Sequence, residues 1–219
     1  MLEFGDVQIT WLGHDGFKLQ RGKIVYVDPY QLQTAAEPAD LVCVTHEHFD
    51  HLSVDDLRKV VTTHTTVVTI PACQQAASGL RPKTVRVVKP GDRLDTEGIA
   101  IEVLPAYNTS KFRSPGMPFH PQADGKVGFI LGIGGIRIYH AGDTDEIPEM
   151  ARAAGVDVAL LPVSGTYVMT AAEAIKACQT IRPQLAIPMH YGAIVGTAAD
   201  AEAFQKGASC RVEVLSPER

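Results

Sequence analysis

The chain has few cysteines, and none of them forms a closely spaced pair. Its 219 residues contain four, at Cys43, Cys73, Cys178 and Cys210. Zinc knuckles and dithiol redox motifs are built from CxxC pairs, so this spacing argues against a cysteine zinc site. Disulfides are not supported either, and free, mostly buried thiols are expected.

Long hydrophobic runs are also absent. A membrane-spanning helix needs about 18 or more consecutive apolar residues, and no window of this sequence approaches that length. The opening MLEFGDVQITWLGHDGF lacks the positive region followed by an apolar stretch that marks a secretion signal. These absences predict a soluble, cytoplasmic protein with no membrane partner.

The chain carries little excess charge of either sign. The 25 acidic and 20 basic residues give a formal net charge of −5, and no run of basic residues could follow a phosphate backbone. Nucleic acid is therefore not an expected partner. With 45% hydrophobic and 21% charged residues, the chain can bury a full core. One globular domain over residues 1–219 is expected.

Short β-rich segments, separated by Gly, Pro and Asp, dominate the pattern. The predicted strands are 7–11, 16–19, 24–27, 41–45, 66–70, 84–88, 99–104, 127–133, 136–139, 158–161, 185–188 and 211–215. Helical patterns cover 53–61, 73–78, 147–154, 171–180 and 199–207, with Ser53 and Thr170 as N-caps. Strands gather early and again after Lys126, each group followed by helices. This order predicts an α/β (α+β) protein with two stacked sheets, a four-layer αββα sandwich.

The residues able to carry chemistry are concentrated where one predicted strand ends. The segment 41–45 is followed by His46-Glu47-His48-Phe49-Asp50-His51. Alternate side chains of an extended segment share a face, so the first two histidines point the same way and the turn redirects Asp50 and His51. Neutral imidazoles and a carboxylate suit zinc, iron or manganese. The pattern therefore predicts a metal site.

This motif resembles the HxHxDH signature of the metallo-β-lactamase superfamily, in the same strand-to-loop context. Three further features follow in the expected order: Asp28 in Val-Asp-Pro, Asp143 in Ala-Gly-Asp-Thr, and His190 after the strand 185–188. With the opening Trp-Leu-Gly-His-Asp-Gly-Phe, they look like the branch of small hydrolases that includes ascorbate-6-phosphate lactonase. The resemblance covers essentially the whole chain.

The resemblance implies two divalent metal ions, zinc in the first place, with manganese and iron as alternatives. The first ion would be held by His46 and His48, the second by Asp50, His51 and His190, and both would be bridged by Asp143. Supporting residues are also implied near the ligands. Asp28 is expected to orient the ligand loop by accepting hydrogens. His14 and His140 are expected to support the site or the fold, and His64 to lie on the surface.

The sequence departs from the superfamily pattern at one place. Many members supply a third histidine to the first metal from a Pro-Ala-x-His segment after the strand equivalent to 99–104. Here that segment ends in Asn108, and an amide is a poor zinc ligand beside imidazole. His120, at the far end of the long loop 107–125, is the other unassigned histidine in this interval. We predict that His120 completes the first site, with Asn108 beside it as a substrate-binding or supporting group.

Two cations that share a water molecule generate a hydroxide nucleophile and polarise a carbonyl or phosphoryl oxygen. Asp50 is predicted to act as a catalytic residue that takes and returns a proton. The expected substrate is a small ester, lactone, amide or phosphoester. An anionic group on it would be held by Lys111 and Arg113, which otherwise form part of a solvated face. A non-hydrolytic metal-binding sensor or partner-binding module is the alternative, and a nuclease of the same fold is a third reading. The natural substrate, the native metal and the oligomeric state stay open.

Overall fold

The computed structural model describes residues 1–33 and 35–218, which form two seven-stranded sheets. The first sheet contains, in spatial order, β1 (Leu2–Phe4), β2 (Val7–Gly13), β3 (Gly16–Arg21), β4 (Lys23–Val27), β5 (Leu41–Cys43), β6 (Thr66–Thr69) and β7 (Thr84–Val87). The strands β1 to β4 pair antiparallel, and β4 to β7 pair parallel. Neighbouring strands are thus joined by hairpins up to β4 and by crossover connections after it.

The second sheet has the spatial order β16-β15-β14-β13-β12-β9-β8. In chain order its strands are β8 (Arg93–Thr96), β9 (Ile99–Pro105), β12 (Val127–Ile133), β13 (Ile136–His140), β14 (Val158–Pro162), β15 (Leu185–Met189) and β16 (Arg211–Val212). The pairs β8·β9, β9·β12 and β12·β13 are antiparallel, and the pairs from β13 to β16 are parallel.

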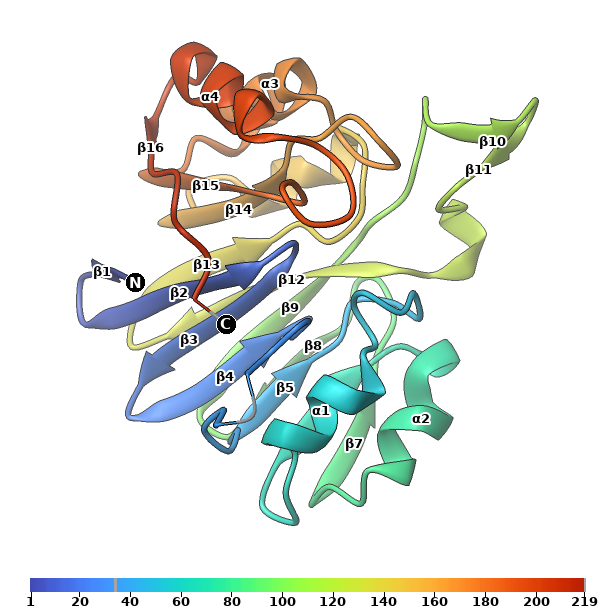
Figure 1. The fold of residues 1–219 in the computed structure, drawn as a ribbon, viewed down its shortest axis with the longest axis vertical. Helices are drawn as coiled ribbons and strands as arrows, with labels where there is room; N and C mark the ends of the chain where they lie inside the picture. Colours follow the sequence, from blue (N-terminus) through green and yellow to red (C-terminus); the bar gives the residue numbers. More distant parts are fainter. Residues whose placement is uncertain (34, 219) are drawn as a thin grey trace.

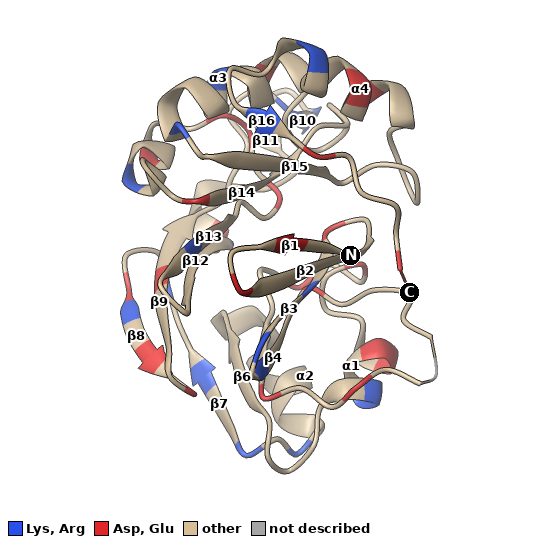
Figure 2. Ribbon diagram, turned by 90° about the vertical axis from the view of Figure 1, so that its left-hand side faces the viewer, with Lys and Arg blue, Asp and Glu red and all other residues tan. Residues whose placement is uncertain are grey.

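Helices cover the outer faces of both sheets. Beside the first sheet lie α1 (Val54–Val60), the 3₁₀ turn η1 (Pro71–Cys73) and α2 (Gln74–Gly79), and beside the second lie η3 (Pro148–Ala153), α3 (Ala171–Ile181) and α4 (Ala198–Gly207). Figure 2 shows the stack from the side, with α3 and α4 at one end and α1 and α2 at the other. The predicted αββα sandwich is confirmed.

The central parallel strands are buried on both faces, which explains their unbroken apolar sequences. Every residue of β5 (LVC), β14 (VALLP) and β15 (LAIPM) is buried. A helix layer covers one face of such a strand and the opposite sheet covers the other, so alternation with polar residues is not needed. Each fully buried Leu, Ile or Val side chain contributes about 1.5–3 kcal/mol through removal from water. The loops that follow these strands are therefore attached to fully buried elements.

Several elements differ from the sequence-based expectation. The segment 107–125 contains a small hairpin of β10 (Phe112–Ser114) and β11 (Met117–Pro118), followed by the 3₁₀ turn η2 (Gln122–Asp124). The hairpin projects from the body of the molecule in Figure 1. The predicted helix 147–154 is the 3₁₀ helix η3, and β1 and β8 were not predicted. Among the described residues, no helix combines the length and the apolar character needed to cross a membrane.

The two predicted N-caps behave differently. Thr170 forms a capping box at α3, in which its hydroxyl accepts from the Glu173 N–H and the Glu173 carboxylate accepts from the Thr170 N–H. Ser53 stands at the N-cap of α1, but its hydroxyl donates to the Asp56 carboxylate at 2.7 Å instead of accepting from the backbone.

Candidate metal centre

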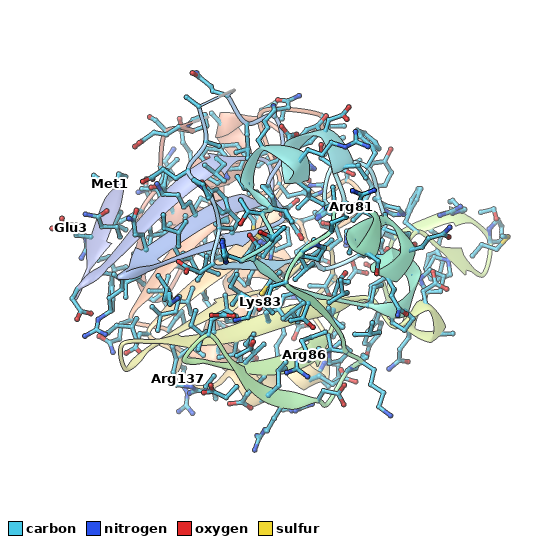
Figure 3. The ribbon with its side chains drawn as sticks, turned by 90° about the horizontal axis from the view of Figure 1, so that it is seen from below. Met1, Glu3, Arg81, Lys83, Arg86 and Arg137 are labelled. Atoms are coloured by element: carbon cyan, nitrogen blue, oxygen red, sulfur yellow. The ribbon has the colours of Figure 1, made fainter. Side chains whose placement is uncertain are left out.

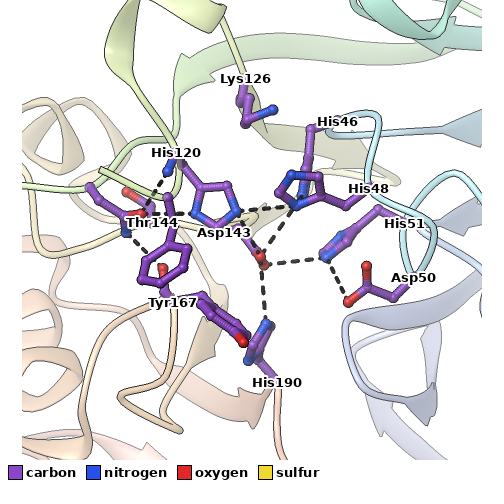
Figure 4. A network of polar contacts seen from close by, with 12 residues as sticks. His46, His48, Asp50, His51, His120, Lys126, Asp143, Thr144, Tyr167 and His190 are labelled. Atoms are coloured by element: carbon purple, nitrogen blue, oxygen red, sulfur yellow. Dashed lines mark hydrogen bonds and ion pairs between the residues drawn. The ribbon is translucent and has the colours of Figure 1, made fainter. Parts of the chain in front are cut away.

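One edge of the sandwich collects polar side chains from segments far apart in the sequence. Parallel strands bring their carboxyl ends to one edge of a sheet, where binding sites of α/β folds form. His46 comes shortly after β5, Asp143 after β13 and His190 after β15. The turn between β2 and β3 adds His14 and Asp15. Figure 4 shows the histidines converging on Asp143.

Four side chains form a first cluster of metal-ligating type. One donor atom from each lies within 4.8 Å of all the others, and the four residues are His46, His48, His120 and Asp143. The His46 Nε2 and His48 Nδ1 atoms are 3.0 Å apart. The His120 Nε2 lies 3.4 Å from both His48 Nδ1 and Asp143 Oδ2. The structure thus places His120 beside His48 and Asp143, and its role as a metal ligand stays a prediction.

The imidazoles of this first cluster are held neutral. Burial lowers the pKa of His46 well below its usual value and lowers that of His48, with neighbouring positive groups adding to the effect. Burial likewise lowers the pKa of His120 to about 4. A neutral imidazole offers a lone pair to a cation, so the cluster is in its metal-binding protonation state at neutral pH.

A second cluster shares Asp143 with the first. The His51 Nε2 lies 3.4 Å from Asp143 Oδ1 and 3.8 Å from Asp50 Oδ2, and the His190 Nε2 lies 3.5 Å from Asp143 Oδ2. His14 also belongs here, because its Nε2 lies 2.9 Å from Asp50 Oδ2 and its ring centroid lies 4.2 Å from that of His190. Every ligand assigned from the sequence therefore lies in one of two adjoining clusters.

The second cluster favours positive charge. Burial opposes charge on His190, but the carboxylates of Asp143 and Asp15 outweigh it and raise its pKa to about 9. Burial also opposes charge on His51, yet Asp143 and Asp28 raise its pKa well above the usual value. Burial alone would raise the pKa of Asp143, and the adjacent His190 and His51 hold it well below its usual value instead. A metal cation supplies such positive charge in place of protons.

Hydrogen bonds fix the orientation of the ligand rings. Asp28 Oδ1 accepts from the Thr45 N–H at 2.8 Å, and Asp28 Oδ2 lies 2.7 Å from His51 Nδ1. Asn108 Oδ1 lies 3.0 Å from His120 Nδ1, and Ser164 Oγ lies 2.9 Å from His190 Nδ1. An Nδ1 engaged in this way leaves Nε2 to face the cluster. The contacts of Asp28 and Asn108 are of the supporting kind that was predicted.

Other residues singled out in the sequence lie apart from the ligand atoms. His140 Nε2 donates to the Asp15 carbonyl at 2.8 Å and holds the β2–β3 turn, and His64 is exposed. Lys111 is engaged by Glu173 at 2.7 Å and by Asp145 at 3.4 Å. Among the described residues it is not part of the lining of the cavity over the clusters.

A cavity of about 670 Å³ opens over the two clusters. Its apolar lining comes from Phe49, Phe119, Tyr167, Ile194 and Val195. Phe49 is 66% exposed at its rim. Among the described lining residues Arg113 supplies the cationic side chain, with its guanidinium 5.6 Å from the Phe119 ring centroid. The cavity thus has apolar side chains on its wall, the metal-ligating side chains at its base, and the cationic side chain of Arg113.

Comparison with known proteins agrees with this site. Residues 8–190 match the family model of the beta-lactamase superfamily domain. The chain is 30% identical to a UPF0173 metal-dependent hydrolase of Methanosarcina mazei over 97% of this chain and 96% of that protein. It is 32% identical to one of Methanoculleus marisnigri, over 96% and 94%. The crystal structure of a candidate metal-dependent hydrolase from Parabacteroides distasonis matches with a TM-score of 0.80 and 31% identity, over 97% of this chain and 94% of that one.

The fold and the site define a member of the beta-lactamase superfamily, as the sequence resemblance predicted. Within it, the chain belongs to the UPF0173 metal-dependent hydrolases. The narrower resemblance to ascorbate-6-phosphate lactonase stays a prediction.

Asp15 is the residue near the ligands that sequence reasoning missed. It stands in the quoted motif Trp-Leu-Gly-His-Asp-Gly-Phe, and one donor oxygen of it lies within 4.8 Å of those of His51, Asp143 and His190. Its position in a tight turn between two predicted strands was the available signal, because such a turn lies at a sheet edge.

Proposed function

We propose that the protein is a hydrolase that holds two metal ions, zinc in the first place, and cleaves a small-molecule ester, lactone, amide or phosphoester. The observation that carries the proposal is a set of adjoining donor clusters around Asp143, which groups with His46, His48 and His120 on one side and with His51 and His190 on the other. Asp50 groups with the same two histidines, His51 and His190. The first ion would be held by His46, His48, His120 and Asp143. The second would be held by Asp50, His51, His190 and Asp143.

The buried polar atoms of the site fit bound cations. Among the described residues, His51 Nε2 and Asp143 Oδ1 are buried without a hydrogen-bond partner, and they face each other at 3.4 Å. A buried polar group without a partner costs about 1–3 kcal/mol, and more when it is charged. A metal ion between these atoms would remove that cost. Nitrogen and carboxylate donors suit zinc, manganese and iron.

When bound, two such ions would activate a water molecule and polarise the oxygen of the substrate's scissile group. Asp50 is proposed to handle the proton. Burial alone would raise its pKa, but the hydrogen bond from His14 and the nearby His51 lower it, so the carboxylate is ionised at neutral pH. Asp50 also lines the cavity. It can therefore accept a proton from the nucleophile and pass it to the leaving group.

The cavity supports a substrate that combines an apolar part with an anionic group. One guanidinium nitrogen of Arg113 donates to the Phe119 carbonyl at 3.2 Å, which leaves further N–H donors for a carboxylate or phosphate. The apolar wall would bind the rest of the molecule. Of the two cations expected to hold an anionic group, Lys111 and Arg113, we propose Arg113 for this role, because it lines the cavity.

The charge distribution favours a small molecule over a nucleic acid. On the side of the molecule seen in Figure 3, Arg81, Lys83 and Arg86 lie at or just before β7 of the first sheet, and Arg137 lies on β13 of the second sheet. Two of these cations are within ion-pair distance of carboxylates, Lys83 of Glu97 at 2.8 Å and Arg137 of Glu102 at 3.7 Å. A phosphate backbone is followed by a continuous basic stripe instead.

Hydrolysis by metal-loaded protein tests the proposal. Metal content is counted after reconstitution with zinc, manganese or iron(II). Nitrophenyl esters with and without a carboxylate, aryl lactones and bis(nitrophenyl) phosphate are then assayed. We expect two ions per chain and turnover of at least one class. Arg113→Gln should lower kcat/KM for the anionic esters about 10-to-100-fold, as loss of a charge-assisted hydrogen bond does, and leave neutral esters unchanged. Two bound ions without turnover of any class would favour the sensor or partner-binding alternative.

A further inference from the structure

Asp15 has the surroundings of a metal ligand, although the superfamily signature contains no residue of the β2–β3 turn. Its side chain is 0% exposed, and neither carboxylate oxygen has a hydrogen-bond partner among the described residues. Burying a carboxylate without a partner costs several kcal/mol. An ionised Asp15 therefore needs a cation or a donor beside it, and the surrounding groups show where one would lie.

Three imidazole nitrogens surround the Asp15 carboxylate at distances too long for hydrogen bonds. Asp15 Oδ2 lies 3.6 Å from His14 Nε2, 3.7 Å from His51 Nε2 and 3.8 Å from His190 Nε2. Separations above 3.5 Å between donor atoms that face one another leave room for an ion among them. Metal–oxygen and metal–nitrogen bonds of about 2.0–2.2 Å span such gaps when the ion lies between the atoms.

Hydrogen bonds to the backbone hold the turn that carries Asp15. The His14 carbonyl accepts from the His190 N–H at 3.0 Å and from Trp11 Nε1 at 2.9 Å, and the Asp15 carbonyl accepts from His140 Nε2 at 2.8 Å. A Cβ at Gly16 would meet the Asp28 carbonyl oxygen at 3.1 Å, so this turn is packed closely against β4. The turn that carries Asp15 is therefore held by Trp11 of β2, His140 of β13 and His190, which follows β15.

We propose that Asp15 is a direct ligand of the second metal ion, together with His51, Asp143 and His190. This inference rests on the proposed two-metal function. Asp15 approaches from the protein interior, and Asp50, which lines the cavity, approaches from the open side. Asp15 would thus anchor the second ion from a buried position outside the described cavity lining, and Asp50, which faces the cavity, would remain able to accept and return a proton.

The variant Asp15→Asn tests the role, because it keeps the shape and removes the charge. Stepwise competition with a chromogenic chelator would measure the zinc affinity of each site. We expect the second zinc to bind about 100-fold more weakly or worse, beyond the range of roughly 10-to-100-fold that loss of a supporting contact costs, with the first zinc unchanged. Asp40→Asn is the matched control, because Asp40 precedes β5 at the end of the strand opposite His46. It should bind both ions like the wild type. Wild-type affinity at both sites of Asp15→Asn would overturn the proposal.

A crystal structure of the zinc-loaded wild-type protein, with anomalous scattering at the zinc edge, is independent of how the variant folds. The expected result is an Asp15 oxygen at about 2.0–2.2 Å from the second ion. Two bound ions with Asp15 beyond bonding distance would overturn this inference and leave the proposed function standing. One ion in the first cluster alone would overturn both. A liganded Asp15 in a protein without turnover would support this inference and contradict the hydrolase.

Discussion

The replacement Asn108→Ala probes how the first metal site is assembled. Asn108 is itself held firmly, because its amide donates to the Asp145 carboxylate at 3.0 Å and to the Tyr167 carbonyl at 2.7 Å. Its carbonyl oxygen accepts from the His120 N–H at 2.8 Å and lies 3.0 Å from His120 Nδ1. One side chain therefore sets both the backbone position of His120 and the nitrogen that carries its hydrogen.

The alanine variant leaves the ligand in place and removes what orients it. Loss of such a contact lowers metal affinity by about 10-to-100-fold, which corresponds to about 1.4–2.7 kcal/mol. We expect this loss at the first site alone, because the second site has its own supporting contacts from Asp28 and Ser164. His120→Ala removes the donor atom itself and should cost more. Thr109→Ala, in the same loop, should bind metal like the wild type.

The assay is a two-step chelator competition combined with a metal count on the same samples. The order of affinities for the first ion should be wild type, then Asn108→Ala, then His120→Ala. A His120→Ala protein that keeps both ions at wild-type affinity would refute the assignment of His120. An Asn108→Ala protein that loses the first ion more completely than His120→Ala would show that the amide oxygen is the ligand.

Three further predictions concern charge and protonation. Asp143→Asn should weaken both ions together and reduce turnover to background, and a metal count that shows loss of one ion only would contradict the bridge. Asp28→Asn should weaken the second ion by about 10-to-100-fold, because His51 Nδ1 then faces an amide nitrogen or loses its partner; unchanged affinity in the chelator assay would refute this. Burial lowers the pKa of His120 to about 4, so the unfolded chain, with a usual value of 6.5, takes up this proton first as the pH falls. In metal-free protein its contribution to the free energy of unfolding should be present above about pH 6.5 and lost toward about pH 4, by roughly 2 kcal/mol at pH 5. Urea melts should then show a shallower decline for His120→Gln, and equal slopes would contradict the shift.

The layered fold could be predicted because the local amino-acid composition of its central strands already indicates burial. The apolar runs of β5, β14 and β15 are long enough to read as buried strands, and the helices between them have clear periodicity. The edge strands could not be predicted in the same way. β8 has the sequence RLDT and is stabilised by pairing with β9, and the β10–β11 hairpin has only three and two residues in its strands. Such segments become strands only in tertiary context.

The site was predictable to the extent that it is local. His46, His48, Asp50 and His51 lie within one motif, whereas His120 could be reached only by elimination among the remaining histidines. Asp15 depends on the path of the β2–β3 turn, where the register shifts between Trp11 and Gly13 and His14 has a φ of +50°. Residue spacing does not report such a turn, because the direction of its side chains follows from backbone dihedrals that most residues avoid.

The register of the parallel strands determines how the imidazole rings of His51 and His190 are oriented in the second cluster. Two of its histidines, His51 and His190, follow parallel strands, and the group that orients each one follows the neighbouring strand: Asp28 after β4 supports His51 after β5, and Ser164 after β14 supports His190 after β15. In both cases the last residues of the two strands are register partners. A slip of one residue would move a supporting group by about 3.3 Å and turn its strand's side chains to the other face. That displacement is larger than the 2.7 Å and 2.9 Å separations of the atoms that orient the two imidazole rings, so both contacts would be lost. The hydrophobic runs that fix the register are therefore also what hold the imidazole nitrogens toward the metal site, because the same pairing that buries them aligns each ligand with its support.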